Sequence, residues 1–341
     1  MIVTVTLNPS FDRTIELSAP LERGQVQRVL RSTQEPGGKG VNVSRALHAA
    51  GCDTLAVLPA SPTDPLLGAL AAAGIRTATV PVTAPIRSNT TVTEPDGTTT
   101  KLNEPGAVVG HDIAEALVRL VVESSAGASW LVLAGSLPPG LPDDSYARIV
   151  RAVRTAAEQA GAPVPRIAVD SSGAPLAALM RSDEPIDLIK PNAEELIELT
   201  TALGSDAATA AHDGLLDPDS IGHDDPLVPE LADLLLRRGL RAALVTLGAR
   251  GAVLVTADAV LSADAPRILA RSTVGAGDCS LAGFLLASER GDDDSGCLAQ
   301  AVAHGAAAAS LPGSTVPGPD LADPDLIRIT HHRRAPRPVA G

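Results

Sequence analysis

The segment STVGAGDCSLAGF, residues 272–284, places small residues and one acid directly before an apolar run that predicts a helix. Gly275 and Gly277 flank Ala276, and such small residues let backbone N–H groups approach a ligand closely. A helix N-terminus adds its positive dipole end, so these three residues predict an anion site. Asp278 follows in the first turn. Its carboxylate either caps the helix or accepts a hydroxyl proton while the N–H groups stabilise charge on a transferred group.

A second glycine segment, TLGARG at residues 246–251, follows an apolar run that predicts a strand. It is either a plain tight turn or a loop that wraps nucleotide phosphates. The segment does not match GxxxxGK[ST], and neither glycine segment matches GxGxxG, so the chain has no Walker A loop and no dinucleotide fingerprint there.

The segment KPNAEEL, residues 190–196, closes a predicted strand and opens a predicted helix, with Pro191 at a position suited to a helix start. Asn192 and Glu195 are three residues apart and therefore share one helix face. An amide and a carboxylate there orient a hydrated Mg²⁺ or simply form a capping pair. In isolation the capping interpretation is favoured.

The N-terminal third holds polar residues suited to a phosphorylated polyol. Lys39 lies among three glycines in PGGKGVNVS, residues 36–44, and a lysine surrounded by bare backbone suits a phosphate, the alternative being a flexible turn. Arg87 begins a polar segment and is a candidate clamp on a substrate phosphate. Side chains that hydrogen-bond sugar hydroxyls, or that merely form turns, are Asn8, Asp12, Asn42 and Asn103.

Short apolar runs alternate with helical patterns along most of the chain. The predicted strands are residues 1–7, 54–59, 130–135, 166–170, 187–190 and 242–247, and helices are expected at about 41–50 and 64–73. This rhythm predicts a mainly parallel sheet covered by helices, with ligands outside the carboxyl ends of its strands. Two polar hairpins, 11–32 and 87–103, are too polar for central strands, and we expect them to pair outside the main sheet.

Composition restricts the classes of function. The 341 residues carry a formal net charge of −13 and only 1% aromatic residues, which disfavours nucleic acid and anionic membranes as partners. The three cysteines show no CxxC spacing and the histidines no metal spacing, so we expect a reducing cytoplasm and no zinc site. The first residues lack a signal-peptide pattern, and no apolar run is long enough to span a membrane.

Two segments read as peripheral. Residues 204–228 are acidic and rich in Gly and Pro, and we expect a surface insertion. Residues 319–341 end in HHRRAPRPVAG, including His331 and His332, and we expect a helix or a partly disordered basic tail there.

Taken together, seven segments resemble the ribokinase-like sugar kinases of the phosphofructokinase B (PfkB) branch. They run in the family's order: TLNPSFD (6–12), GGKGVNVS (37–44), RSNTTVTEPDGTTTKLNEPG (87–106), GSLPPG (135–140), KPNAEEL (190–196), TLGARG (246–251) and STVGAGD (272–278). The resemblance implies one α/β domain over residues 1–318, with a central mainly parallel sheet and a small β-sheet lid formed by about 11–32 and 87–103. A homodimer that pairs through the lids is also implied.

The resemblance also assigns roles, for in-line phosphoryl transfer from ATP in the presence of Mg²⁺. Asp278 would be the base, with Gly275, Ala276 and Gly277 as the anion hole. The residues implied to bind the sugar phosphate are Asp12, Gly38, Lys39, Asn42, Arg87 and Asn103. Those implied to bind ATP are Lys190, Asn192, Glu195, Thr246, Leu247, Gly248, Ala249, Arg250, Gly251 and Gly277, with Asn192 and Glu195 also serving Mg²⁺ through water.

The resemblance is strongest to members that phosphorylate fructose 1-phosphate, on the strength of TLNP, RSN and KLNEPG. Tagatose 6-phosphate and fructose 6-phosphate are alternative substrates, and a non-catalytic sugar-phosphate sensor is an alternative of another class. Cys279 departs from the serine that is commoner after the catalytic Asp, a nearly isosteric change that we expect activity to survive. The intact GAGD argues against a sensor.

Overall fold

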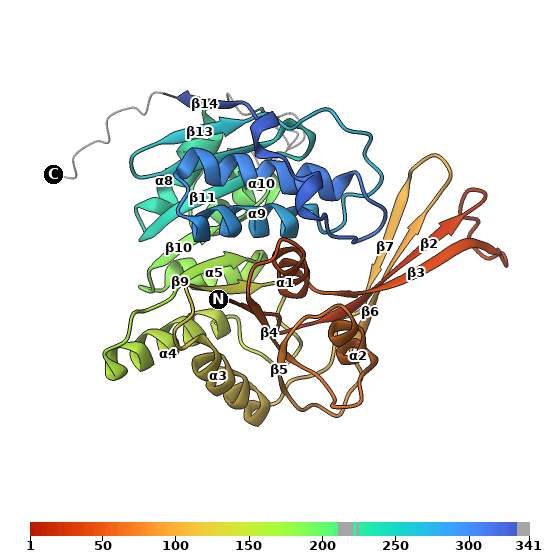
Figure 1. Ribbon diagram of the computed structural model, residues 1–341, viewed down its shortest axis with the longest axis horizontal. Helices are drawn as coiled ribbons and strands as arrows, with labels where there is room; N and C mark the ends of the chain where they lie inside the picture. The colour runs from red at the N-terminus through yellow and green to blue at the C-terminus, as the bar shows by residue number, and fades with distance from the viewer. Residues whose placement is uncertain (211–220, 223–224, 333–341) are drawn as a thin grey trace.

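The computed structural model describes residues 1–210, 221–222 and 225–332. Their strands form two sheets, a large one inside a helical body and a small one that projects from it (Figure 1). The separate small sheet confirms the sequence-based expectation that the polar hairpins lie outside the main sheet. Residues 211–220, part of the predicted acidic insertion, lie outside the described residues, as do 223–224 and 333–341.

The large sheet has ten strands within the described residues, in the order β14-β13-β12-β11-β10-β9-β8-β1-β4-β5. All pairs from β11 to β5 are parallel. The bounds are β1 Ile2–Val5, β4 Thr54–Pro59, β5 Thr77–Val80, β8 Trp130–Ala134, β9 Arg166–Asp170, β10 Ile186–Ile189, β11 Leu240–Thr246, β12 Ala252–Thr256, β13 Val260–Ala263 and β14 Ile329–His332. The predicted mainly parallel sheet is therefore confirmed, with an antiparallel edge at β12 to β14.

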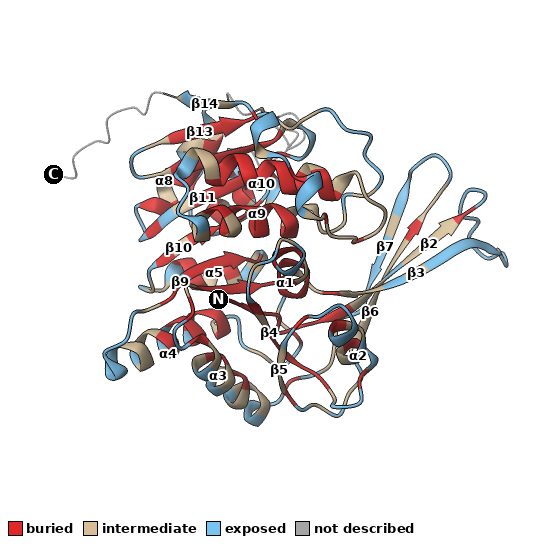
Figure 2. Cartoon of the chain, in the orientation of Figure 1, coloured by how far each residue is buried: buried red, intermediate tan, exposed pale blue. Residues whose placement is uncertain are grey.

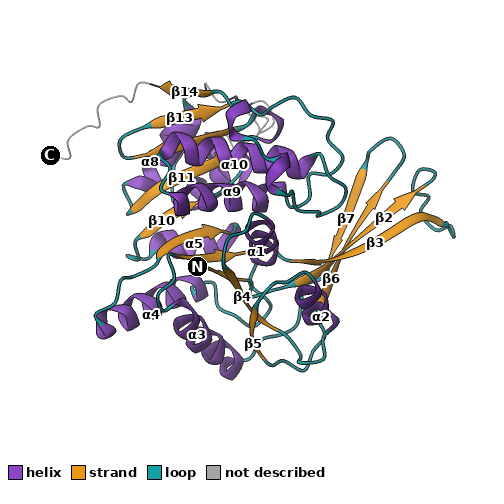
Figure 3. Ribbon diagram, viewed as in Figure 1, coloured by secondary structure: helices purple, strands orange, loops and turns teal. Residues whose placement is uncertain are grey.

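Helices cover both faces of this sheet, so its strands can be apolar on both sides (Figure 3). The α-helices are α1 Lys39–Ala49, α2 Pro65–Ala72, α3 His111–Ser125, α4 Ser145–Ala160, α5 Gly173–Arg181, α6 Ala193–Ala202, α7 Asp206–Ala210, α8 Leu227–Leu236, α9 Ala276–Arg290 and α10 Asp294–Ala309. Short 3-10 helices cover Gly248–Arg250, Pro319–Leu321 and Pro324–Leu326. No helix within the described ranges has both the length and the apolar character needed to span a membrane.

Alternation along the strands divides the core into two layers. In β1, Val3 and Val5 face the layer formed with α3 and α4, whereas Ile2 faces the layer formed with α1, α9 and α10. Side chains that follow each other along a strand point to opposite faces, which explains this division. Burial is nearly complete along the central strands, whereas the residues of the projecting sheet are mostly half-buried or exposed (Figure 2).

The projecting sheet, which we call the lid, has the strand order β3-β2-β6-β7. Its strands are β2 Ser10–Leu17, β3 Val29–Gly37, β6 Arg87–Thr93 and β7 Thr99–Asn103. Each hairpin is antiparallel, and β2 pairs with β6 in parallel, so the two hairpins join as the sequence predicts. The strand β2 begins, and β3 ends, next to the main sheet, which places the lid beside the carboxyl ends of its strands.

The C-terminal segment differs from the expected helix or tail. Ile329–His332 forms β14, which pairs with β13 and extends the large sheet. His332 lies in this strand and its ring Nε2 is 2.7 Å from the hydroxyl of Ser262. A β-branched start, Ile-Thr, at an open sheet edge favours pairing over a free tail, a signal that the basic residues hid.

Candidate active site

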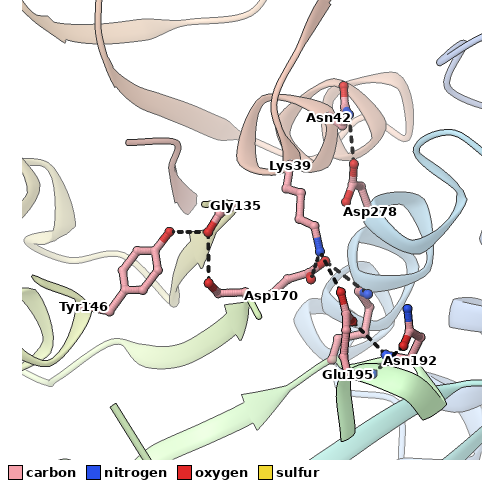
Figure 4. Close-up of polar contacts among 10 residues, drawn as sticks. Lys39, Asn42, Gly135, Tyr146, Asp170, Asn192, Glu195 and Asp278 are labelled. Carbon is pink, nitrogen blue, oxygen red and sulfur yellow. Dashed lines mark hydrogen bonds and ion pairs between the residues drawn. The ribbon is translucent and has the colours of Figure 1, made fainter. Parts of the chain in front are cut away.

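Chemistry-bearing residues from distant parts of the chain meet at the carboxyl ends of the parallel strands (Figure 4). Asp278 lies in the first turn of α9, and its Oδ2 accepts a hydrogen bond of 2.8 Å from Nδ2 of Asn42 on α1. The N-cap position itself is Gly275, which has no side chain to cap the helix. The bond from Asn42, on a different helix, favours the interpretation of Asp278 as a site residue over that of a simple cap.

The environment of Asp278 gives the carboxyl group the character of a base. The side chain is 7% exposed, and burial together with the negative charge of Asp170 raises its pKa to about 6. The positive charges of Lys39 and Lys190 and the bond from Asn42 act in the opposite direction. A carboxylate with a pKa near neutrality is ionised at pH 7 and yet basic enough to take a proton.

Asp170, at the end of β9, holds two lysines next to this base. Its buried carboxylate accepts a hydrogen bond of 2.7 Å from Lys39 and forms an ion pair of 3.1 Å with Lys190. Burial opposes ionisation of Asp170, but the two lysines outweigh it and lower the pKa. Burial likewise opposes the charge of Lys39, yet the carboxylates of Asp170 and Glu195 raise its pKa. The Lys39 ammonium therefore stays charged.

Asn192 and Glu195 form a complete capping box at the start of α6. Asn192 Oδ1 accepts from the Glu195 backbone N–H at 2.7 Å, and Glu195 Oε2 accepts from the Asn192 N–H at 2.9 Å. The capping interpretation is thus correct, while Glu195 Oε1 points toward Lys39 at 3.7 Å and makes no capping bond. This oxygen fits a hydrated Mg²⁺, which usually keeps several waters and binds few carboxylates.

The two glycine loops lie on either side of the lysine pair. Gly275 has φ of 76° and precedes α9, so the backbone turns sharply into the helix. A Cβ at Gly277 would lie 3.1 Å from Lys190 Nζ, so glycine leaves this ammonium more room beside the N–H groups at the start of α9. Thr246 donates its N–H to Pro191, which places the loop of residues 246–251 next to the start of α6.

The predicted sugar-binding residues gather where β2 meets α1. Asp12 accepts from Ser10 and Asn89, and its carboxylate packs onto the backbone of Gly37, where a Cβ would overlap it. Burial raises the pKa of Asp12. Gly38, with φ of 100°, starts α1 and leads directly to Lys39.

Arg87 is half-buried at the start of β6 and donates to two backbone carbonyls, those of Glu104 and Asn8, at 2.9 and 3.2 Å. Burial lowers its pKa. Asn103 is exposed at the end of β7, opposite Asn89, and makes no contact with the lysine pair in the described part of the chain. Sequence reasoning missed Asn89 and assigned no role to Asp170. An acid that ends the apolar strand RIAVD was the available signal for Asp170.

Comparison with known proteins identifies the family. The model of the pfkB family of carbohydrate kinases matches residues 5–321. A 1-phosphofructokinase from Haloferax volcanii is 35% identical over 97% of each chain, and one from Xanthomonas campestris pv. campestris is 32% identical over 84% of this chain and 83% of its own. The chain therefore belongs to the pfkB family of carbohydrate kinases.

Solved structures confirm the ribokinase-like fold. Phosphofructokinase-2 from Escherichia coli, solved in complex with fructose-6-phosphate, superposes with a TM-score of 0.76 at 28% identity, over 92% of this chain and 95% of its own. A ribokinase from Thermotoga maritima shares the fold at 18% identity, with a TM-score of 0.69 over 94% of this chain and 97% of its own.

Proposed function

We propose that this carbohydrate kinase is an ATP-dependent 1-phosphofructokinase, which converts fructose 1-phosphate to fructose 1,6-bisphosphate. The observation that carries the chemistry is Asp278, a buried carboxylate with a raised pKa at the N-terminus of a helix, next to two charged lysines. The choice of sugar rests on relatives of that name that align over most of the chain.

In the proposed reaction, Asp278 takes the proton from the C6 hydroxyl of the sugar. The oxygen of that hydroxyl bonds to the γ-phosphorus of ATP at the same time. The bond between the γ-phosphorus and the bridging oxygen breaks, and ADP leaves. The N–H groups at the start of α9, with Lys39 and Lys190, stabilise negative charge on the phosphoryl group in flight. Asp170 keeps both ammonium groups in place, because each is paired with its carboxylate.

The nucleotide is proposed to lie between the loop of residues 246–251 and the start of α9. Thr246, Leu247, Gly248, Ala249, Arg250 and Gly251 supply that loop. Mg²⁺, held through water by Glu195 and Asn192, would neutralise charge on the phosphates.

The sugar phosphate is proposed to lie under the lid. Asp12 and Asn42 face its hydroxyls, and Gly38 allows a close backbone approach. Arg87 binds its phosphate, because its guanidinium lies at the junction of lid and body. Asn103 contributes from β7 once the lid closes over the substrate.

A second candidate substrate is fructose 6-phosphate, favoured by the likeness to phosphofructokinase-2 from Escherichia coli in complex with that sugar. The test is ADP release from MgATP with purified protein and each of fructose 1-phosphate, fructose 6-phosphate and tagatose 6-phosphate. A kcat/KM at least about tenfold higher for fructose 1-phosphate, a difference of ~1.4 kcal/mol, supports the proposal. Preference for another sugar phosphate refutes the substrate, and tight binding without turnover favours a sensor.

We further propose that two chains pair through their lids. The lid exposes large apolar side chains, including Val26 at 99%, Leu30 at 70% and Leu102 at 60% exposure, which a partner lid would cover. Light scattering on the purified protein checks this, with Val26→Asp and Leu102→Asp expected to shift the mass to that of a monomer.

The three cysteines are free thiols, which supports a cytoplasmic location.

A further inference from the structure

One lid residue reaches the active site through contacts that substrate binding does not require. Glu35, near the end of β3, accepts from the Ser314 N–H at 3.1 Å and from the Ser314 hydroxyl at 2.7 Å. Thr315 adds a hydroxyl contact at 3.4 Å. These three donors attach the loop after α10 to the lid, although Glu35 and Ser314 are 279 residues apart in the chain.

Arg45 on α1 ties the same point to the catalytic centre. Its Nη2 lies 3.8 Å from Glu35 Oε1, while its Nη1 donates to the carbonyls of Pro36 and Ser314 at 2.9 and 3.3 Å. Nη1 also lies 3.4 Å from Oδ1 of Asn42. The Arg45 side chain is 11% exposed, so its hydrogen bonds meet little competition from water.

Arg45 and Asp278 favour the same orientation of the Asn42 amide. A guanidinium can only donate and an ionised carboxylate can only accept, so the amide oxygen faces Arg45 and Nδ2 faces Asp278. This is the orientation observed, with Nδ2 at 2.8 Å from Asp278 Oδ2. A Cβ at Gly275 would lie 3.9 Å from both Asn42 Nδ2 and Ser314 Cβ, so the loop, the amide and the anion hole are neighbours.

We propose that Glu35 is a positioning residue that links the lid to the base, acting through Arg45 and Asn42 on Asp278. When the lid is in its place, Glu35 holds Arg45, and the oriented amide of Asn42 then fixes the Asp278 carboxylate. A displaced lid releases Arg45, and the Asn42 amide then keeps only its bond to Asp278, which holds the carboxylate less firmly. Catalytic geometry is thereby completed only under a correctly seated lid. This inference rests on the proposed role of Asp278 as the base.

The charged groups around Asp278 give the proposal a measurable signature. Asp170 from β9, Lys39 from α1 and Lys190 from the end of β10 face the carboxyl group, and all three remain when Glu35 is changed. The bond from Asn42 lowers the pKa of Asp278. Weakening of that bond must therefore raise this pKa and move the acid limb of the pH profile to higher pH.

The test compares Glu35→Gln with Glu16→Gln, a matched change on the neighbouring lid strand β2. Glu35→Gln should lower kcat about tenfold, move the acid limb of kcat/KM up by about half a pH unit or more, and leave the KM for MgATP within about twofold. Glu16→Gln should change none of these. The double variant Glu35→Gln with Arg45→Met should lose about as much kcat as the worse of the two single variants. The losses are not additive because both substitutions break the same chain of contacts to Asn42.

Thermal melts and MgATP binding show whether each variant is folded. If Glu35→Gln fails to fold, Ser314→Ala removes one donor to Glu35 and should lower kcat about threefold, with the same direction of pH shift. An unchanged acid limb and kcat in folded Glu35→Gln would overturn the proposal, as would additive losses with Arg45→Met. The wild type is assayed first with all three sugar phosphates. Absence of any turnover there refutes the proposed function, and with it the positioning role, because no base is then at work.

Discussion

Replacing Asp278 by Asn tests the proposed chemistry most directly. The change removes the proton acceptor and its charge while keeping the volume of the side chain. Because Asn42 Nδ2 donates to the carboxylate at 2.8 Å, the new amide will turn its oxygen toward Asn42 and its NH₂ toward the sugar hydroxyl. A donor then faces the group that must lose a proton. We expect kcat to fall at least about a thousandfold, since both proton acceptance and charge alignment are lost.

The same variant should be more stable than the wild type above pH 6. The pKa of Asp278 is about 6 in the folded protein against the ordinary 3.8 of an aspartate, a difference that corresponds to roughly 3 kcal/mol. The folded state holds the proton of Asp278 more tightly than the unfolded state does. The contribution of this group to the free energy of unfolding is therefore full below about pH 3.8 and is lost as the pH rises through about 6. Asparagine carries no charge and avoids that loss, so its Tm at pH 8 should exceed that of the wild type by a few degrees.

The assay is coupled ADP release at pH 8 with saturating MgATP and the preferred sugar phosphate, together with calorimetric binding of both ligands. Asp294→Asn is a matched control, because Asp294 also lies in the first turn of a helix and burial also raises its pKa. It should turn over normally. Turnover of Asp278→Asn within about tenfold of the wild type, with sugar binding intact, would refute Asp278 as the base.

Three further predictions follow from the same contacts. The kcat/KM of the wild type should fall about tenfold for each pH unit below about 6, where Asp278 becomes protonated; a pH profile with its acid midpoint near 4.5 would contradict this. Asp170→Ala should destabilise the fold by about 3–5 kcal/mol, because the ammonium groups of Lys39 and Lys190 lose their partner. Urea unfolding measures this loss, and adding Lys190→Met should recover part of it. Gly283→Ala should lower the free energy of unfolding by about 1–3 kcal/mol, because the new Cβ would press into the backbone of α10. Gly68→Ala on α2 has open space around it and should raise the free energy of unfolding by about 0.5–1 kcal/mol. Equal effects of the two changes in denaturant melts would refute the steric reasoning.

Local patterns in the sequence were sufficient for the elements. The apolar run TLAVLP is β4 at residues 54–59, and Asp96-Gly97 joins β6 and β7. Such elements depend on side-chain alternation and turn chemistry within a few residues, so they can be recognised without any knowledge of the fold. The edge strand β14 was missed because its pairing depends on a strand that is distant in the sequence: Ile329 lies opposite Ala263.

The glycine segments, the acid at 278 and the Asn-Glu pair were recognisable as candidate site residues because each carries its chemistry within a short stretch. Whether each residue caps a helix or belongs to the site depended on its contacts with distant parts of the chain. Asn192 and Glu195 satisfy each other locally, so the capping box was within reach of sequence reasoning. Asp278 could be separated from a helix cap only by its bond to Asn42, which is 236 residues away in the chain.

The sequence by itself determined the βα rhythm, the polar hairpins and the order of the chemistry-bearing segments, since these follow from periodicity and from residue type. Only the tertiary structure decided that Asp170 holds Lys39 across 131 residues, that Arg45 and Asp278 orient the amide of Asn42, and that Glu35 connects the lid to Arg45. The physical reason is that a hydrogen bond or ion pair acts over a few ångströms, and the packing of helices on the sheet sets which side chains come within that distance.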